Sequence, residues 1–294
     1  MEWFGNPDWG YHSVLGATIM FRLFFLIGVS VVLRLEYLLA ATIVRAKARD
    51  WTENKIRIFT ARVISLTHAT LSSIGCLCSL LSDSNYVKEP YDYSTYSAQY
   101  IFLFSMGYFI YDMIDMYIHG EAPYSKEYFV HHSLVLTAFS IILYTGKLFG
   151  FAMIALLVEV QTIFLHLRTM IRLTRYAKKR SPFYIALINA NMACLFVFRH
   201  LTITYLLYVM LYKDEKCPLP LRAFLTSGLL FLTYHNTHLT IRLESDRQKP
   251  AAIGGGQGRG SISMVKADGF FGYEMQSLDE DHVDPLGPVK VKKS

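Results

Sequence analysis

Apolar segments of membrane-spanning length recur throughout the first 243 residues, and they limit what this 294-residue chain can fold into. A transmembrane helix needs about 20 consecutive, mainly apolar residues. Because a lipid bilayer offers the backbone no hydrogen-bond partners, such spans fold as helices. The sequence therefore predicts an all-α, polytopic membrane helix bundle. Its predicted spans are residues 13–33, 58–81, 97–118, 128–144, 148–171, 183–211 and 221–243.

The number of spans depends on the first apolar region. Apolar character resumes at residues 35–44, so this region is either one long helix or a span followed by an interfacial piece. The prediction is accordingly six or seven transmembrane helices. The composition agrees with a membrane protein, because 53% of the residues are hydrophobic and only 18% are charged. Ordinary soluble domains contain about 25% charged residues.

The basic residues indicate orientation in a membrane and not nucleic acid binding. The formal net charge is +6, and Lys and Arg gather in the loops at residues 45–57 and 172–180. Lys and Arg are enriched in cytoplasmic loops. With seven spans, this rule places the two basic loops and the carboxyl terminus in the cytosol. No nucleic acid partner is expected.

The chain divides into three regions by composition. Residues 1–44 form an amino-terminal segment with the first transmembrane helix, and residues 45–243 form the main membrane domain. Residues 244–294 contain the run AAIGGGQGRGS and few large apolar residues. Such a composition is typical of a flexible, disordered segment. The prediction for residues 244–294 is a disordered cytosolic tail.

A polar stripe follows one face of the predicted span at residues 97–118. Tyr108, Tyr111, Asp112 and Asp115 fall at positions i, i+3, i+4 and i+7, which share one side of a helix. Lipid cannot satisfy two carboxylates, so the stripe must face other helices or a wet cavity. The predicted span at residues 148–171 repeats the spacing with a second stripe, formed by Glu159, Thr162 and His166.

Further ionisable side chains lie inside other predicted spans: His68, His131, His132, Arg199 and His235. Charged groups at this depth are costly unless they pair, so carboxylates should lie opposite histidines or Arg199. The network either fixes the helix register or handles a ligand. A histidine with a neighbouring acid can also transfer protons. Whether a reaction is catalysed stays open.

No metal is predicted, because the sequence lacks an HExxH motif and the candidate ligands lie on several spans without a diagnostic spacing.

Three segments carry a family resemblance: GYFIYDMIDMY, YFVHHS and ALLVEVQTIFLHLRTM. They resemble the TLC-domain membrane proteins, which include ceramide synthases, TRAM proteins and several lipid-homeostasis proteins. The resemblance covers residues 45–242 and implies a TLC-type bundle. The segments LGATIMFR, LVEV and IFLHLR are similar to the branch that governs membrane fluidity. That branch implies a plasma-membrane protein that limits polyunsaturated acyl chains in phospholipids.

The resemblance also suggests site residues. Ceramide synthases carry a histidine pair followed by Asp-Xaa-Xaa-Asp, and these residues are tied to acyl transfer from acyl-CoA. At the matching positions this chain has His131 and His132, then Glu159, while Thr162 replaces the second acid. The resemblance makes His131, His132 and Glu159 the candidate catalytic residues, with acyl-CoA as a substrate and no resident cofactor.

Three functions follow as alternatives. The first is a lipid-homeostasis protein whose partners are membrane phospholipids or acyl chains. The second is an acyl-CoA-dependent acyltransferase of the ceramide-synthase type. The third is a non-catalytic scaffold or channel modulator, in which the polar stripes only hold the bundle together. No protein partner is indicated.

Overall fold

A computed structural model describes residues 9–120, 126–176, 181–213 and 216–248. This part of the chain is helical and contains no β-strand, which confirms the predicted all-α bundle. Its elements, two of them π-helical (η), are α1 (Trp9–Lys47), α2 (Glu53–Ser82), α3 (Asn85–Lys88), α4 (Tyr96–Ile118), α5 (Lys126–Thr145), α6 (Phe149–Leu156), α7 (Glu159–Thr174), α8 (Pro182–Leu195), η2 (Phe196–Leu201), α9 (Thr202–Tyr208), η3 (Val209–Lys213) and α10 (Leu219–Gln248).

Polar residues set the starts of the long helices. The side chains of Thr52 and Thr95 accept hydrogen bonds from backbone N–H groups in the first turns of α2 and α4. Ser181 caps α8 in the same way, and Pro182 occupies the first helical position. Such caps satisfy donors that the helix itself leaves unpaired. The span predicted to start at residue 183 thus begins one residue after the start of α8.

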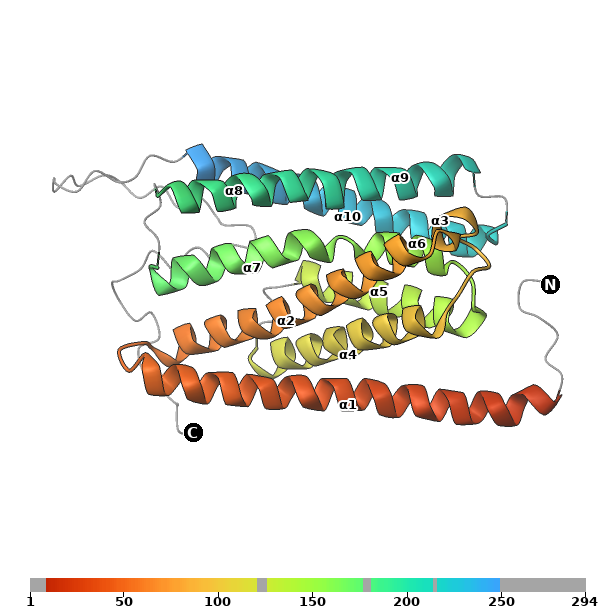
Figure 1. Ribbon diagram of the computed structural model, residues 1–294, viewed down its shortest axis with the longest axis horizontal. Helices are drawn as coiled ribbons and strands as arrows, with labels where there is room; N and C mark the ends of the chain where they lie inside the picture. Colours follow the sequence, from red (N-terminus) through yellow and green to blue (C-terminus); the bar gives the residue numbers. More distant parts are fainter. Residues whose placement is uncertain (1–8, 121–125, 177–180, 214–215, 249–294) are drawn as a thin grey trace, which may run out of the picture.

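The long helices run side by side along one axis (Figure 1). The red helix α1 lies at one side of the bundle, α8 and α9 lie at the opposite side, and α2 and α4 to α7 lie between them. Six stretches in the described residues are long and apolar enough to cross a membrane: Ile19–Lys47, Glu53–Ser82, Tyr96–Ile118, Lys126–Thr145, Phe149–Thr174 and Pro182–Lys213. The helix α10 covers the predicted seventh span, although it does not reach the same apolar composition.

Two of the spans depart from a regular α-helix. The sequence predicts one continuous helix at residues 148–171, but the structure interrupts it between α6 and α7. There the N–H groups of Leu157 and Val158 bond to carbonyls three residues earlier, which tightens the turn. A new helix then starts at Glu159. The following span contains η2 and η3, two π-helical segments. By contrast, the first span is one uninterrupted helix, α1.

A short strap, residues 83–95 including α3, folds over the start of α6. The N–H of Leu148 donates to the carbonyl of Tyr91 over 2.8 Å, and the N–H of Gly150 donates to that of Pro90 over 3.1 Å. A Cβ on Gly150 would lie only 2.1 Å from the carbonyl oxygen of Tyr86, so glycine permits this close approach. We call this end of the bundle the strap end.

The predicted disordered tail lies largely outside the described residues. The helix α10 continues to Gln248, and residues 249–294 are not described.

Candidate functional site

The centre of the bundle contains a buried stack of aromatic rings around His68 on α2. Its imidazole lies flat on the ring of Tyr108 from α4, with centroids 3.9 Å apart and planes 8° apart. The Tyr108 hydroxyl in turn donates to Ser65 Oγ over 2.9 Å. The ring of Phe109 meets His68 edge-on at 5.3 Å. Since His68 is only 1% exposed, these contacts fix its position between α2 and α4.

Glu159 faces this stack from the first turn of α7. Its Oε2 lies 3.9 Å from Nδ1 of His68, and both side chains are buried. The predicted stripe of Glu159, Thr162 and His166 therefore meets α2, with His68 as the nearest histidine. The other ring nitrogen of His68, Nε2, has no hydrogen-bond partner among the described residues. The helix break before Glu159 places this carboxylate beside a turn in the middle of the span.

Arg199 connects three helical spans. It lies in the π-helical segment η2, and such segments are frequent at functional sites. Its Nη2 donates to Thr162 Oγ1 over 2.9 Å, and its Nη1 donates to Asn236 Oδ1 on α10 over 3.1 Å. Thr162, which replaces an acid of the ceramide-synthase pattern, thus keeps an oxygen that Arg199 can bind. Arg199 was expected opposite a carboxylate, whereas these two hydrogen bonds go to neutral oxygens.

His132 on α5 lies beside Asp112 on α4. Nδ1 of His132 is 3.4 Å from Oδ2 of Asp112, although the geometry is not that of an aligned hydrogen bond. The imidazole also packs against the ring of Phe109, with centroids 4.8 Å apart. A histidine beside a carboxylate is the arrangement that general base catalysis uses. A carboxylate was expected opposite a histidine, and Asp112 lies opposite His132.

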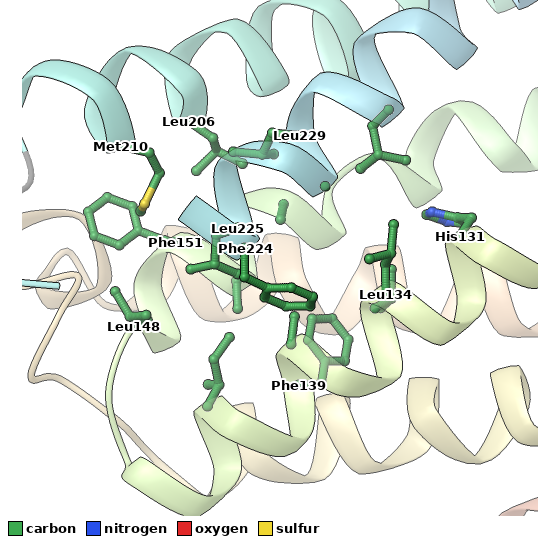
Figure 2. Close-up of a pocket in the computed structure, with 17 residues that line it drawn as sticks. His131, Leu134, Phe139, Leu148, Phe151, Leu206, Met210, Phe224, Leu225 and Leu229 are labelled. Carbon is green, nitrogen blue, oxygen red and sulfur yellow. The ribbon is translucent and has the colours of Figure 1, made fainter. Parts of the chain in front are cut away.

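His131 points in another direction, into an apolar chamber (Figure 2). The chamber has a volume of about 130 Å³, and His131 is its one lining residue with a polar side chain. Its walls come from α5, Leu148 and the following helix α6, α9, η3 and α10. They are Leu134, Val135, Ala138, Phe139, Ile142, Leu148, Phe151, Ala152, Ala155, Leu206, Met210, Phe224, Leu225, Gly228, Leu229 and Leu232. In the described residues Nδ1 of His131 is a buried atom without a hydrogen-bond partner.

The first polar stripe divides among several partners. Tyr108 joins His68 and Asp112 joins His132, whereas Asp115 turns toward α1. Oδ1 of Asp115 accepts from Arg34 Nη1 at 3.3 Å, and its Oδ2 lies 3.4 Å from Nδ1 of His119. Tyr111 is buried on the same helix. The stripe therefore connects α4 to three neighbouring helices.

Two further predicted residues lie around this centre. His166 is buried on α7. His235 on α10 lies 6.4 Å from the ring of Tyr128 on α5, so it faces the helix that carries the histidine pair.

Sequence reasoning missed several groups that the structure brings together. Asn236 binds Arg199, and Gln161 donates to Asn191 Oδ1 over 2.8 Å in the buried contact between α7 and α8. Arg22 in the first span donates to Gln99 Oε1 over 2.8 Å and to the carbonyl of Leu143 over 2.9 Å. A search for amide side chains within the predicted spans could have found Asn236, Gln161 and Asn191. The chamber has no signal in the sequence, because its lining residues are ordinary apolar ones.

The described residues contain no group of three or more His, Cys, Asp or Glu side chains arranged to hold a metal ion.

Comparison with known proteins places this geometry in context. Residues 58–243 match the family described as TLC domain. The chain is 37% identical over 139 residues to TLC domain-containing protein 2 of Danio rerio, covering 47% of this chain and 56% of that protein. It is 32% identical over 172 residues to TLC domain-containing protein 1 of Gallus gallus, covering 58% and 66%.

A longer match covers TLC domain-containing protein 1 of Rattus norvegicus, at 28% identity over 230 residues, 77% of this chain and 85% of that protein. The chain thus spans between half and two thirds of the length of the first two relatives.

Proposed function

The chain belongs to the TLC-domain family of membrane proteins, and from that premise we propose that it handles acyl chains of membrane lipids. In this proposal an acyl chain lies in the apolar chamber, and its polar end lies at His131. The protein thereby limits polyunsaturated chains in phospholipids and regulates membrane fluidity. The observation that carries the proposal is the chamber itself, whose walls are apolar except for one imidazole with a buried, unbonded nitrogen.

The size and chemistry of the chamber support an acyl chain. Empty cavities lined by apolar side chains stay dry, and one of about 150 Å³ binds benzene. A chamber of about 130 Å³ suits a segment of a hydrocarbon chain. Its lining on α5 extends from His131 to Ile142, which is about 16 Å at the helical rise of 1.5 Å per residue. A chain could therefore lie lengthwise along α5.

The chamber is not closed toward the bilayer. Gly228 on α10 lines it, and a Cβ at Gly228 would meet no atom within 4 Å. Neighbouring lining residues on α5 and α10, such as Leu134 and Leu232, are partly exposed. A lipid chain could therefore reach the chamber sideways, between α5 and α10, without crossing water.

The test is a binding measurement on the purified chain in nanodiscs, with the fluorescent fatty acid cis-parinaric acid as the probe. Filling the open space with Gly228→Phe should abolish the bound fluorescence, because the ring would occupy the chamber. Gly28→Phe is the matched control, since a Cβ at Gly28 on α1 also meets nothing within 4 Å but lies away from the chamber. Equal binding by both variants and the unmodified protein would overturn the proposal.

An acyltransferase is the second candidate, and the histidine pair favours it. His131 lies in the chamber while His132 lies beside Asp112, with the two imidazole centroids 5.5 Å apart. A general base with an orienting acid would then lie next to the end of a bound chain. Incubation with labelled acyl-CoA and candidate lipids distinguishes the two functions. Transfer that His132→Ala abolishes would establish an enzyme, and binding without transfer would leave the lipid-handling role.

We also propose a plasma-membrane location with the basic loops and the tail in the cytosol. The reasons are the family branch and the positive-inside rule. Lys88→Cys on the strap should then react with an impermeant thiol label added to intact cells. Labelling that occurs only after permeabilisation would contradict the proposed location and orientation.

A further inference from the structure

The strap end of the chamber is closed by the packing of the strap on α6. The chamber wall there is formed by Leu148, Phe151 and Met210, all of them buried (Figure 2). Behind this wall the ring of Tyr91 packs edge-on against Phe151, with centroids 5.0 Å apart. Because Tyr91 belongs to the strap, the strap is in direct contact with a ring that lines the chamber.

One carboxylate ties the strap to two other loops. Asp92 follows Tyr91, and its Oδ1 lies 2.5 Å from Lys147 Nζ in the loop between α5 and α6. Its Oδ2 lies 3.5 Å from Lys216 Nζ in the loop before α10. The Lys216 ammonium also lies 5.7 Å from the centre of the Tyr91 ring. We call Asp92, Lys147 and Lys216 the clasp.

The clasp joins the elements whose side chains make up the chamber. Lys147 directly precedes Leu148, which lines the chamber. Lys216 precedes α10, whose side chains also line it. The three clasp side chains are between 37% and 69% exposed, so solvent screens their attraction. Exposed ion pairs of this kind contribute little to folding. Loss of the clasp should therefore leave the bundle folded, while it removes the side-chain contacts that join the strap to the two other loops.

We propose that Asp92 is a specificity-determining residue, which through the clasp holds the end wall of the chamber and so sets the length of acyl chain that fits. The inference rests on the proposed function, because it assumes that acyl chains occupy the chamber. With the clasp formed, Tyr91 supports Phe151 and the chamber ends at that ring. Without the clasp the strap can move away from α6. The Phe151 ring then has room to rotate and make space for a longer acyl chain.

The test measures chain-length preference by displacement of cis-parinaric acid from the full-length chain in nanodiscs. A graded series of saturated fatty acids serves as competitors. The unmodified protein should bind more tightly as the chain lengthens, until one further methylene costs about tenfold or more in affinity, the penalty for overfilling an apolar pocket. We call the chain length at which this loss of affinity occurs the break. Asp92→Asn should move the break to longer chains and leave the affinity for shorter chains unchanged.

Controls separate the clasp from the chamber. Glu89→Gln removes an exposed charge from the same strap and should leave the break in place. Phe151→Ala enlarges the chamber directly and should move the break whatever the clasp does. Lys216→Gln removes one side of the clasp and should move the break in the direction of Asp92→Asn.

A break that Phe151→Ala moves but Asp92→Asn leaves unchanged would overturn the role of the clasp and retain the chamber. Binding that Gly228→Phe does not affect would overturn the proposed function, and this inference with it.

Discussion

At the scale of single residues, polar groups inside the bundle are held in pairs that cross between helices. His68 meets Glu159, His132 meets Asp112, and Arg199 meets both Thr162 and Asn236. Each pair joins two different spans, so the pairs fix the helix register as well as the site. Thr162 contributes a neutral oxygen to this centre and accepts the hydrogen bond from Arg199 Nη2.

Thr162 offers a test of this pairing. Thr162→Val keeps the shape but removes the oxygen that accepts from Arg199 Nη2. Hydrogen bonds between helices in membranes contribute roughly 0.6 to 1.7 kcal/mol, so the variant should lose about 1 kcal/mol and a few degrees in Tm in nanodiscs. Thr162→Ser keeps the hydroxyl and should melt like the unmodified protein. Equal melting of both variants would show that this hydrogen bond contributes nothing to stability.

At the scale of elements, small residues decide where helices approach closely. Gly107 on α4 faces α1, where a Cβ would lie 2.7 Å from Val29 Cγ1 and 3.2 Å from the carbonyl oxygen of Leu26. The carbonyl of Gly107 also accepts from Ser30 Oγ over 2.8 Å. Close packing and hydrogen bonds of this kind drive helix association in membranes. The hydrophobic effect does not, because the lipid chains are as apolar as the helix surface.

Gly107→Ala should therefore weaken the contact between α1 and α4. Overpacking of this kind costs about 1 to 3 kcal/mol, more than the gain in helix propensity of about 1 kcal/mol from replacing glycine. Gly28→Ala supplies the control, because a Cβ at Gly28 meets nothing within 4 Å. Thermal unfolding should show a lower Tm for Gly107→Ala alone. A Gly107→Ala protein as stable as Gly28→Ala would contradict the contact.

The sequence predicted the helices better than their interruptions. Apolar length located the spans, because that signal is local. The break before Glu159 and the π-helical segment at Arg199 were not predicted, because no Pro or Gly marks either place in the sequence. The same holds for the site. Helical spacing identified the polar stripes, but it could not assign His68 to Glu159, and the chamber exists only once α5, α6 and α10 are packed together.

At the scale of the whole molecule, the two ends of the bundle differ. The strap end ties three loops that are distant in the sequence through Asp92, and a second strap carboxylate, Asp83, accepts from the hydroxyl of Tyr93. The hydrogen bond from Lys147 lowers the pKa of Asp92, and Lys216 adds to this effect. The hydrogen bond from Tyr93 lowers the pKa of Asp83.

Both lowered pKa values predict an acid-sensitive strap. A carboxylate whose pKa falls on folding contributes stability above its unfolded pKa of about 3.9, and this contribution is lost as the pH falls through the lower folded value. Protease cleavage of the strap should therefore be constant from neutral pH to about pH 5 and rise below about pH 4. Asp92→Asn should show a smaller acid-dependent rise, since it removes one of the two strap carboxylates whose pKa is lowered. An unchanged pH profile in that variant would exclude Asp92 as the titrating group.

The helix α1 borders one side of the bundle for its whole length, and large apolar side chains are exposed on it from Ile19 to Ile43 (Figure 1). At 1.5 Å per residue this stretch measures about 37 Å. The hydrocarbon layer is roughly 27 Å thick in the endoplasmic reticulum and 32 to 33 Å in the plasma membrane. Hydrophobic mismatch costs fractions of a kcal/mol for each ångström, so a thin bilayer forces α1 to tilt more steeply. A protein proposed to regulate fluidity would thus carry on its edge a helix that matches thick bilayers best.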